Sequence, residues 1–182
     1  MTAPDLPLRT ERLTLRAHQP ADLDRLLEVY GNPDVCRYLL FEPWTPGEAE
    51  TQLGKRVLRT DYGGEAEALG LVLDLDGAYI GDVVIFPFES QPRTAELGWV
   101  LHPSYTGHGY AEEAARALIR VAFEHYDLHR VIANLDGRND ASARLCERLG
   151  LRREAHHLQD FWSKGEWTDT LIYAALASEW PA

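Results

Sequence analysis

Hydrophobic and polar residues alternate along the chain in two periods, one typical of strands and one typical of helices. Residues 13–16 alternate with period 2, as in a half-buried strand, and residues 20–30 repeat leucines at helical spacing. A loop that carries Phe41 and Trp44 precedes a weaker helical pattern over 47–60. The N-terminal part of the chain therefore predicts one strand followed by two helices.

The middle of the chain predicts a hairpin and a further strand. Residues 68–75 and 78–86 are strand-like runs, and Asp76 and Gly77 between them suit the positive φ angles of a two-residue type I′ turn. Residues 94–101 form another strand-like run, which ends shortly before a proline.

The remaining residues continue the alternation of strands and helices. Residues 110–126 place their apolar side chains on one helical face, which predicts a helix packed on a sheet. A strand over 130–135, a short helix over 140–149 and two last strands around 165–167 follow. The whole pattern predicts a mixed α/β fold with a largely antiparallel sheet.

Length and composition narrow the class of protein. The 182 residues contain no repeat and no Gly-, Ser- or Pro-rich linker, so we expect a single domain over residues 1–182. The net charge of −11 argues against binding to nucleic acid or to an anionic membrane. Acidity mildly favours cationic partners such as amines, although many proteins are acidic for solubility alone.

Cysteines, histidines and the N-terminus bear on location and metals. Cys36 and Cys146 form neither a metal-ligand spacing nor a disulfide framework, and the histidines show no metal-binding spacing, so no metal is expected. The N-terminus lacks a signal-peptide pattern, and no apolar run approaches the roughly 18 residues that span a bilayer. We therefore expect a soluble cytoplasmic protein.

The stretch 102–114 carries the most informative chemistry. It joins the end of a strand to a long helix through Gly107 and Gly109, and such a turn exposes backbone N–H groups beside a helix N-terminus. This arrangement suits a pyrophosphate, although the two glycines also suit a helix entry that only needs a tight turn. The dinucleotide fingerprint would need a third glycine where Glu112 stands, and the P-loop motif is absent.

Residues 106–111 resemble the pyrophosphate loop of the GNAT superfamily of acyl-CoA N-acyltransferases, Gln/Arg-x-x-Gly-x-Gly/Ala, with Thr106 in place of the first residue. The chain is most similar to the branch with ribosomal-protein-alanine N-acetyltransferases (RimJ/RimL-type). The motifs that carry this resemblance are Glu96-Leu97-Gly98-Trp99, Gly109-Tyr110-Ala111-Glu112-Glu113-Ala114, Asn139-x-x-Ser142 with Leu149-Gly150, and Gly165-x-Trp167-x-Asp169.

The resemblance implies a fold and a donor. The expected fold is a twisted sheet of six to seven strands with about four helices, splayed at a bulge in the strand 94–101. Acetyl-CoA would enter the split, with its pantetheine amides on this strand and its diphosphate on the amides of 105–110. The residues expected to contact it are Trp99, Val100, Leu101, Thr106, Gly107, His108, Gly109, Tyr110, Ala111, Asn139 and Ser142.

The resemblance also implies catalytic roles. Glu96 matches the glutamate that acts as general base, through water, in similar enzymes; alternatively it is a solvated or paired carboxylate of the strand. Ser142 matches the serine that protonates the leaving thiolate, and Cys146 occupies the position where many relatives use a tyrosine. Asn139 also suits a helix N-cap, a role that can coexist with cofactor contact. A backbone N–H near Val100 would polarise the thioester carbonyl.

The acceptor is expected to be a primary amine, in a monomer or a homodimer. Phe41, Trp44, Trp162 and Trp167 lie where similar enzymes build the acceptor cleft, although such aromatics also suit a second small core. Neutralising an α-amine at pH 7 takes about 1 kcal/mol, against about 4 to 5 kcal/mol for a lysine, which favours a peptide N-terminus. The alternatives are a small-molecule amine, a catalytically silent acyl-CoA-binding domain, and a nucleotide- or phosphosugar-binding enzyme.

Overall fold

The computed structural model describes residues 3–88 and 91–180, whose strands form one nine-stranded sheet. The strand order is β1-β2-β4-β5-β6-β7-β9-β8, with β3 paired to β4. The β6–β7 pair is parallel and the other pairs are antiparallel. The strands are β1 (Leu8–Arg9), β2 (Thr14–Ala17), β3 (Thr60–Asp61), β4 (Ala68–Leu75), β5 (Ala78–Pro87), β6 (Thr94–Leu101), β7 (Arg130–Asp136), β8 (Arg152–Ser163) and β9 (Glu166–Leu176).

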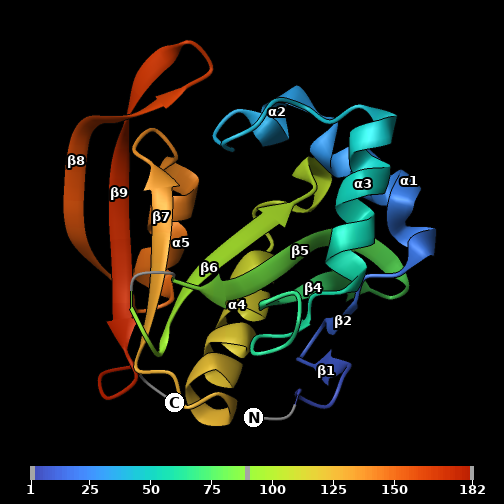
Figure 1. The fold of residues 1–182 in the computed structure, drawn as a ribbon, viewed down its shortest axis with the longest axis horizontal. Helices are drawn as coiled ribbons and strands as arrows, with labels where there is room; N and C mark the ends of the chain where they lie inside the picture. Colours follow the sequence, from blue (N-terminus) through green and yellow to red (C-terminus); the bar gives the residue numbers. More distant parts are fainter. Residues whose placement is uncertain (1–2, 89–90, 181–182) are drawn as a thin grey trace.

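The sheet divides into two arms between β6 and β7 (Figure 1). These two strands pair only over Thr94 to Glu96; beyond Glu96, β6 continues along β5 while β7 continues along β9. The splay expected from the sequence is therefore present. The β5–β6 register, however, runs in step from Pro87–Ala95 to Gly81–Leu101, so the expected bulge does not appear on that side of the strand. The arms separate where the parallel pairing ends.

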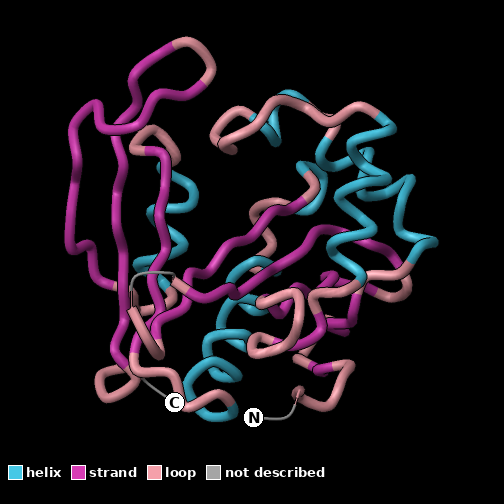
Figure 2. Tube along the Cα trace, viewed as in Figure 1, coloured by secondary structure: helices cyan, strands magenta, loops and turns pink. Residues whose placement is uncertain are grey.

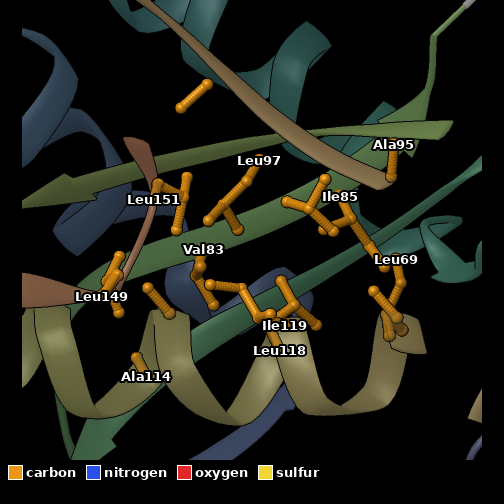
Figure 3. Packing of buried hydrophobic residues seen from close by; sticks show 14 of the residues in the cluster. Leu69, Val83, Ile85, Ala95, Leu97, Ala114, Leu118, Ile119, Leu149 and Leu151 are labelled. Atoms are coloured by element: carbon orange, nitrogen blue, oxygen red, sulfur yellow. The ribbon is translucent and has the colours of Figure 1, made fainter. Parts of the chain in front are cut away.

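Helices cover the two faces of the β4–β5–β6 arm (Figure 2). On one face, α4 buries Ala114, Leu118 and Ile119 against apolar side chains of β4, β5 and β6, such as Leu69 and Val83 (Figure 3). On the other face, α1 and α3 enclose a second, smaller core. The helices are α1 (Leu23–Tyr30), α2 (Pro33–Cys36), α3 (Pro46–Val57), α4 (Tyr110–Arg120) and α5 (Asp140–Arg148), with 3-10 turns over Pro20–Asp22 and Pro103–Tyr105 and a π-helical turn over Val121–His125.

Local sequence explains most element boundaries. Thr45 and Glu48 form a capping box at the start of α3, so this helix begins at Pro46 and ends at Val57 rather than running over 47–60. Asp76 and Gly77 both have positive φ, which confirms the predicted type I′ turn. No helix within residues 3–88 and 91–180 is long and apolar enough to cross a membrane.

The mixed, largely antiparallel α/β fold is confirmed, with more elements than expected. The two additional strands, β1 and β3, have two residues each, and the additional helix α2 has four. Two strand residues contain a single alternation and four helix residues little more than one turn, so neither repeats its period. No pattern in the sequence could therefore have revealed them.

Candidate active site

The loop between β6 and α4 is shaped by two glycines. Gly107 and Gly109 both have φ of +81°, the left-handed region, and Gly109 is the N-cap of α4. A Cβ on Gly107 would meet nothing within 4 Å, so this glycine is required by backbone conformation rather than by crowding. The loop thus presents its amides at the N-terminus of an 11-residue helix, an arrangement that attracts anions.

Arg12 holds this loop from outside, a role that no motif indicated. Its Nε lies 2.7 Å from Glu113 Oε2, and its Nη1 donates to the His108 carbonyl at 2.8 Å. Glu113 also accepts from Thr10 Oγ1 at 2.6 Å, and these contacts hold the pKa of Glu113 below its ordinary value despite partial burial. The charge of Glu113 is therefore neutralised by Arg12, and Glu112, the other acidic residue of this turn, pairs with Arg148 at 2.8 Å.

Two cavities lie along this loop. The first, which we call the strand–loop cavity, has about 400 Å³ and runs between β6, the loop and α5. The second, the glycine-loop cavity, has about 330 Å³ and adjoins it. All the residues expected to contact the donor line one or both of these cavities except His108, which contributes its carbonyl to Arg12 and stacks on Tyr110. Arg148 lines both cavities and was not predicted.

The start of α5 joins the strand–loop cavity to a further cavity. Asn139 is the N-cap, and its Oδ1 accepts from the Ser142 N–H at 3.1 Å. Both residues line the strand–loop cavity and the neighbouring cavity near β5. Cys146, one turn along, is completely buried, and burial raises the pKa of its thiol to about 12. Ser142 therefore reaches the cavities, whereas the Cys146 thiol lies in the core.

The neighbouring cavity, which we call the arginine cavity, has about 310 Å³ and lies over β5 and β6 on the face covered by α1 and α3. Buried Arg56 pairs with buried Asp82, with Nη1 and Oδ1 3.0 Å apart. Asp82 also accepts from the hydroxyls of Tyr30 at 2.8 Å and Tyr79 at 2.6 Å. Arg59, half-buried, lines the same cavity.

Glu96 lies in a fourth space, the acidic cavity, of about 520 Å³ between the two arms. Burial raises the pKa of Glu96, and a hydrogen bond from Asn134 on β7 partly offsets that rise. The other ionisable residues that line this cavity are Asp136, Asp160, Asp169 and His157. A carboxyl group with a raised pKa in a cavity is a candidate proton acceptor.

The acidic and arginine cavities form one continuous space beside β6. They share the lining residues Tyr38, Leu39, Leu40, Asn134 and Leu135. At the far end, Lys164 Nζ in the β8–β9 turn donates to the Cys36 carbonyl at the end of α2, which links the two arms. None of these lining residues carried a signal in the sequence, because each is brought to the cavity by the packing of α2 and β7.

The four candidate acceptor aromatics are not brought together. Trp44 is buried in the second core, stacked on Tyr30 with ring centroids 4.3 Å apart. Phe41 stacks on Trp44 and lines the arginine cavity. Trp162 and Trp167 pack edge to face on the β8–β9 hairpin, each 57% exposed, and line none of the cavities described above.

The described residues contain no group of three or more His, Cys, Asp or Glu side chains that could hold a metal ion.

Known proteins share this chain's sequence and fold. The acetyltransferase (GNAT) domain profile matches residues 12–152. The uncharacterised N-acetyltransferase YnaD of Bacillus subtilis is 31% identical over 95% of this chain and 98% of its own. The [ribosomal protein uS5]-alanine N-acetyltransferase of Escherichia coli is 27% identical over 97% of this chain and 94% of its own.

A solved structure gives the same result at the level of the fold. The GNAT-family acetyltransferase from Bacillus anthracis superposes with a TM-score of 0.84 at 29% identity, covering 94% of this chain and 99% of that one. The profile, the relatives and the superposition agree on residues from nearly the whole chain, and we conclude that this protein is a member of the GNAT family of acetyltransferases.

Proposed function

We propose that this enzyme transfers the acetyl group of acetyl-CoA directly to a primary amine in a ternary complex. One observation carries the proposal: Asn139 and Ser142 line both the strand–loop cavity and the arginine cavity. A donor in the first cavity and an acceptor in the second would meet beside these residues. Direct attack requires that the two substrates be held together in this way. We also propose that residues 1–182 act as one domain, since the described strands form a single sheet.

The donor would be bound mainly by main-chain groups. Beyond Glu96, β6 has no partner strand on its β7 side, so its backbone is available to the pantetheine amides. The diphosphate would lie on the amides of residues 105–110, where α4 begins. Arg148 lines both loop cavities; its Nε lies 2.8 Å from Glu112 Oε2, and the rest of its guanidinium would donate hydrogen bonds to the phosphates.

Three groups would carry the chemistry. Glu96, whose raised pKa makes it a stronger base than an ordinary glutamate, would accept the amine proton through a water molecule. A backbone N–H of β6 near Val100 would polarise the thioester carbonyl. Ser142 would donate a proton to the departing thiolate as the carbon–sulfur bond breaks and the amide bond forms.

The acceptor we favour is an α-amine of the kind found at a peptide N-terminus. Such an amine loses its proton for about 1 kcal/mol at pH 7, whereas a lysine side chain needs about 4 to 5 kcal/mol. The relative from Escherichia coli named above acts on an alanine of a ribosomal protein, which agrees with this chemistry. Amines of small metabolites or antibiotics are the second candidate, because the arginine cavity is small enough to enclose them.

Thermal unfolding with and without acetyl-CoA tests the donor first, with equimolar ATP as control. A ligand at 100 times its Kd stabilises the native state by about 2.7 kcal/mol, a shift of several degrees in Tm. A shift with acetyl-CoA alone is expected, followed by release of free thiol when an amine is added. No shift at millimolar acetyl-CoA would refute the transferase proposal, and a shift without thiol release from any amine would indicate a silent acyl-CoA-binding domain.

A further inference from the structure

Val84 and Gly98 on the floor of the arginine cavity lie in register with Gly70 on the neighbouring strand. Gly70 on β4 pairs with Val84 on β5, which pairs with Gly98 on β6. Arg59 lies over Gly70: a Cβ placed on that glycine would be 3.5 Å from Arg59 Cβ and 3.6 Å from its Cδ. The missing side chain of Gly70 thus makes room for the stem of Arg59, whose side chain lines the cavity.

The charges in this cavity do not balance. Asp82 is engaged by Arg56, Tyr30 and Tyr79. Among the ion pairs and side-chain hydrogen bonds within residues 3–88 and 91–180, none involves the Arg59 guanidinium; Asp82 attracts it at longer range but already pairs with Arg56. The cavity therefore holds two guanidinium groups and one carboxylate.

The environment of Arg59 is unfavourable for an unpaired cation. Burial, followed by repulsion from Arg56, lowers the pKa of Arg59. In addition, Arg56 Nε is buried without a hydrogen-bond acceptor in the described part of the chain. Removing a charge from water without a partner is costly, and a bound anion would offset that cost. The imbalance therefore points to a negatively charged group on the ligand.

Arg59 and Glu96 lie at two ends of one space. Gly98 and Glu96 are on the same face of β6, two residues apart. With strands about 4.8 Å apart and a rise of about 3.3 Å per residue, the Cα atoms of Gly70 and Glu96 are separated by roughly 12 Å. The Glu96 end is acidic and also contains Asp160, whereas the Arg59 end is basic. The space is therefore polarised in the way that suits a molecule with a positive and a negative end.

We propose that the acceptor carries a carboxylate, which Arg59 binds in the arginine cavity while the amine lies beside Glu96. The substrate class is an amino carboxylate in which several bonds separate the two groups. A free amino carboxylate and a peptide with an acidic residue next to its N-terminal amine both supply this chemistry. This inference rests on the proposed acetyl transfer and names the acceptor of that same site.

The test compares acceptors that differ only in charge, with thiol release measured at saturating acetyl-CoA. The series contains ω-amino carboxylates of increasing length, unsubstituted amines of matching length, diamines, and tetrapeptides with glutamate or glutamine in the second position. We expect kcat/KM for the best carboxylate acceptor to exceed that of its matched amine at least about tenfold, as a hydrogen-bonded charge pair provides. Whether the free acids or the glutamate peptide give the advantage distinguishes the two sources of the carboxylate.

Arg59→Gln then assigns the effect to the guanidinium. It should raise KM for carboxylate acceptors about tenfold and change kcat/KM for plain amines less than about twofold, because only the former lose a charged partner. Arg59→Lys should keep part of the preference, since it keeps the charge but loses the planar fork. Arg120→Gln, an exposed change of the same charge, is the control and should leave the preference intact.

Two results would overturn the inference while leaving the proposed function standing. One is wild-type acetylation of plain amines or diamines with no advantage for any carboxylate. The other is an equal loss for all acceptors in Arg59→Gln, which would mean that Arg59 only supports the fold. If no acceptor releases thiol and acetyl-CoA gives no thermal shift, the proposed function fails and this inference fails with it.

Discussion

The strand–loop cavity and the arginine cavity adjoin along β6, yet they are built in different ways. The first takes most of its lining from one continuous stretch, Trp99 to Ala111, and from the start of α5. The second collects side chains from α1, α3, β5, β6 and β7. A surface made from consecutive backbone is encoded locally by glycines and a helix start, whereas a surface made from distant side chains depends on how the helices dock.

The largest expected effect is that of Glu96→Gln, which should act on the acceptor side alone. Loss of a general base costs roughly 10²- to 10⁴-fold in kcat. Burial raises the pKa of Glu96, so wild-type activity should decrease on acidification at a pH above the ordinary pKa of glutamate. The pH–activity profile of the variant should lack this acidic decrease. Steady-state kinetics from pH 5 to 9 would measure both effects.

A stability measurement serves as control for Glu96→Gln. The native state keeps this proton to higher pH than the unfolded state does, so ionisation of Glu96 above its native pKa opposes folding. The variant removes that cost, and its Tm at pH 7 should equal or exceed that of the wild type. A kcat of wild-type size in the variant would remove Glu96 from the mechanism. A changed Kd for acetyl-CoA would mean that Glu96 also affects donor binding, so that the donor and acceptor cavities do not act independently.

Acid should weaken the core behind the arginine cavity through His18. His18 is buried beside Tyr79, has no hydrogen-bond partner in the described residues, and burial lowers its pKa to about 4. The unfolded state binds the proton below about 6.5, so the stability contributed by neutral His18 is complete above that pH and is lost between about 6.5 and 4. The loss is about 3 kcal/mol.

Urea unfolding at pH 7 and pH 4.5 would measure this loss. His18→Leu should remove most of it, because leucine does not titrate and the ring nitrogens have no bonds to lose. His129→Gln, at an exposed position, should retain the wild-type dependence. An unchanged pH slope in His18→Leu would contradict the assignment.

On the donor side, Gly109→Val should break the loop. A β-branched residue at φ of +81° costs roughly 1–3 kcal/mol and would move the amides, so we expect Kd for acetyl-CoA to rise at least about tenfold. Gly77→Val imposes the same kind of strain at φ of +87° in the β4–β5 turn, and should reduce stability while leaving that Kd unchanged. Titration calorimetry on both variants makes the comparison, and equal Kd values would show that the loop amides do not bind the donor.

Ser142→Ala and Cys146→Ala should show the smallest effects and separate two candidates on one helix. Ser142 lines both cavities, so its loss should lower kcat about tenfold with little change in donor Kd. Cys146 is in the core, so its loss should reduce stability by about 1 kcal/mol and leave kcat unchanged. The reverse pattern, with kcat lost only in Cys146→Ala, would make the thiol the proton donor.

The sequence predicted the residues that line the strand–loop and glycine-loop cavities better than those that line the arginine cavity, and the reason is physical. Gly107 and Gly109 are required because the backbone has a positive φ at each of these positions. Gly77 in the type I′ turn is required for the same reason. Trp44, which the family resemblance placed in the acceptor cleft, instead stacks on Tyr30 in the second core, with side chains of α1 and α3 around it.

Arg59 illustrates what no local pattern could supply. It lies beyond the end of α3, and it reaches the cavity because its stem passes over Gly70, a residue of another strand. Their pairing continues that of β3 with β4, because the Gly70 N–H donates to the Arg59 carbonyl at 2.8 Å beside the Thr60–Leu69 pair. Local sequence patterns do not contain that information, so the position of Arg59 in the cavity can be recognised only from the complete fold.

The short β6–β7 pairing also determines which backbone amides of β6 exchange their hydrogens quickly with solvent. Only Thr94 to Glu96 join the two arms by strand pairing, and the rest of β6 has a hydrogen-bonded neighbour on one side. Those amides of residues 97–101 that point into the gap should exchange their hydrogens with solvent quickly, whereas the amides bonded to β5 should exchange slowly. The exchange rate of these β6 amides therefore reports on occupation of the gap, because a molecule bound there would slow their exchange.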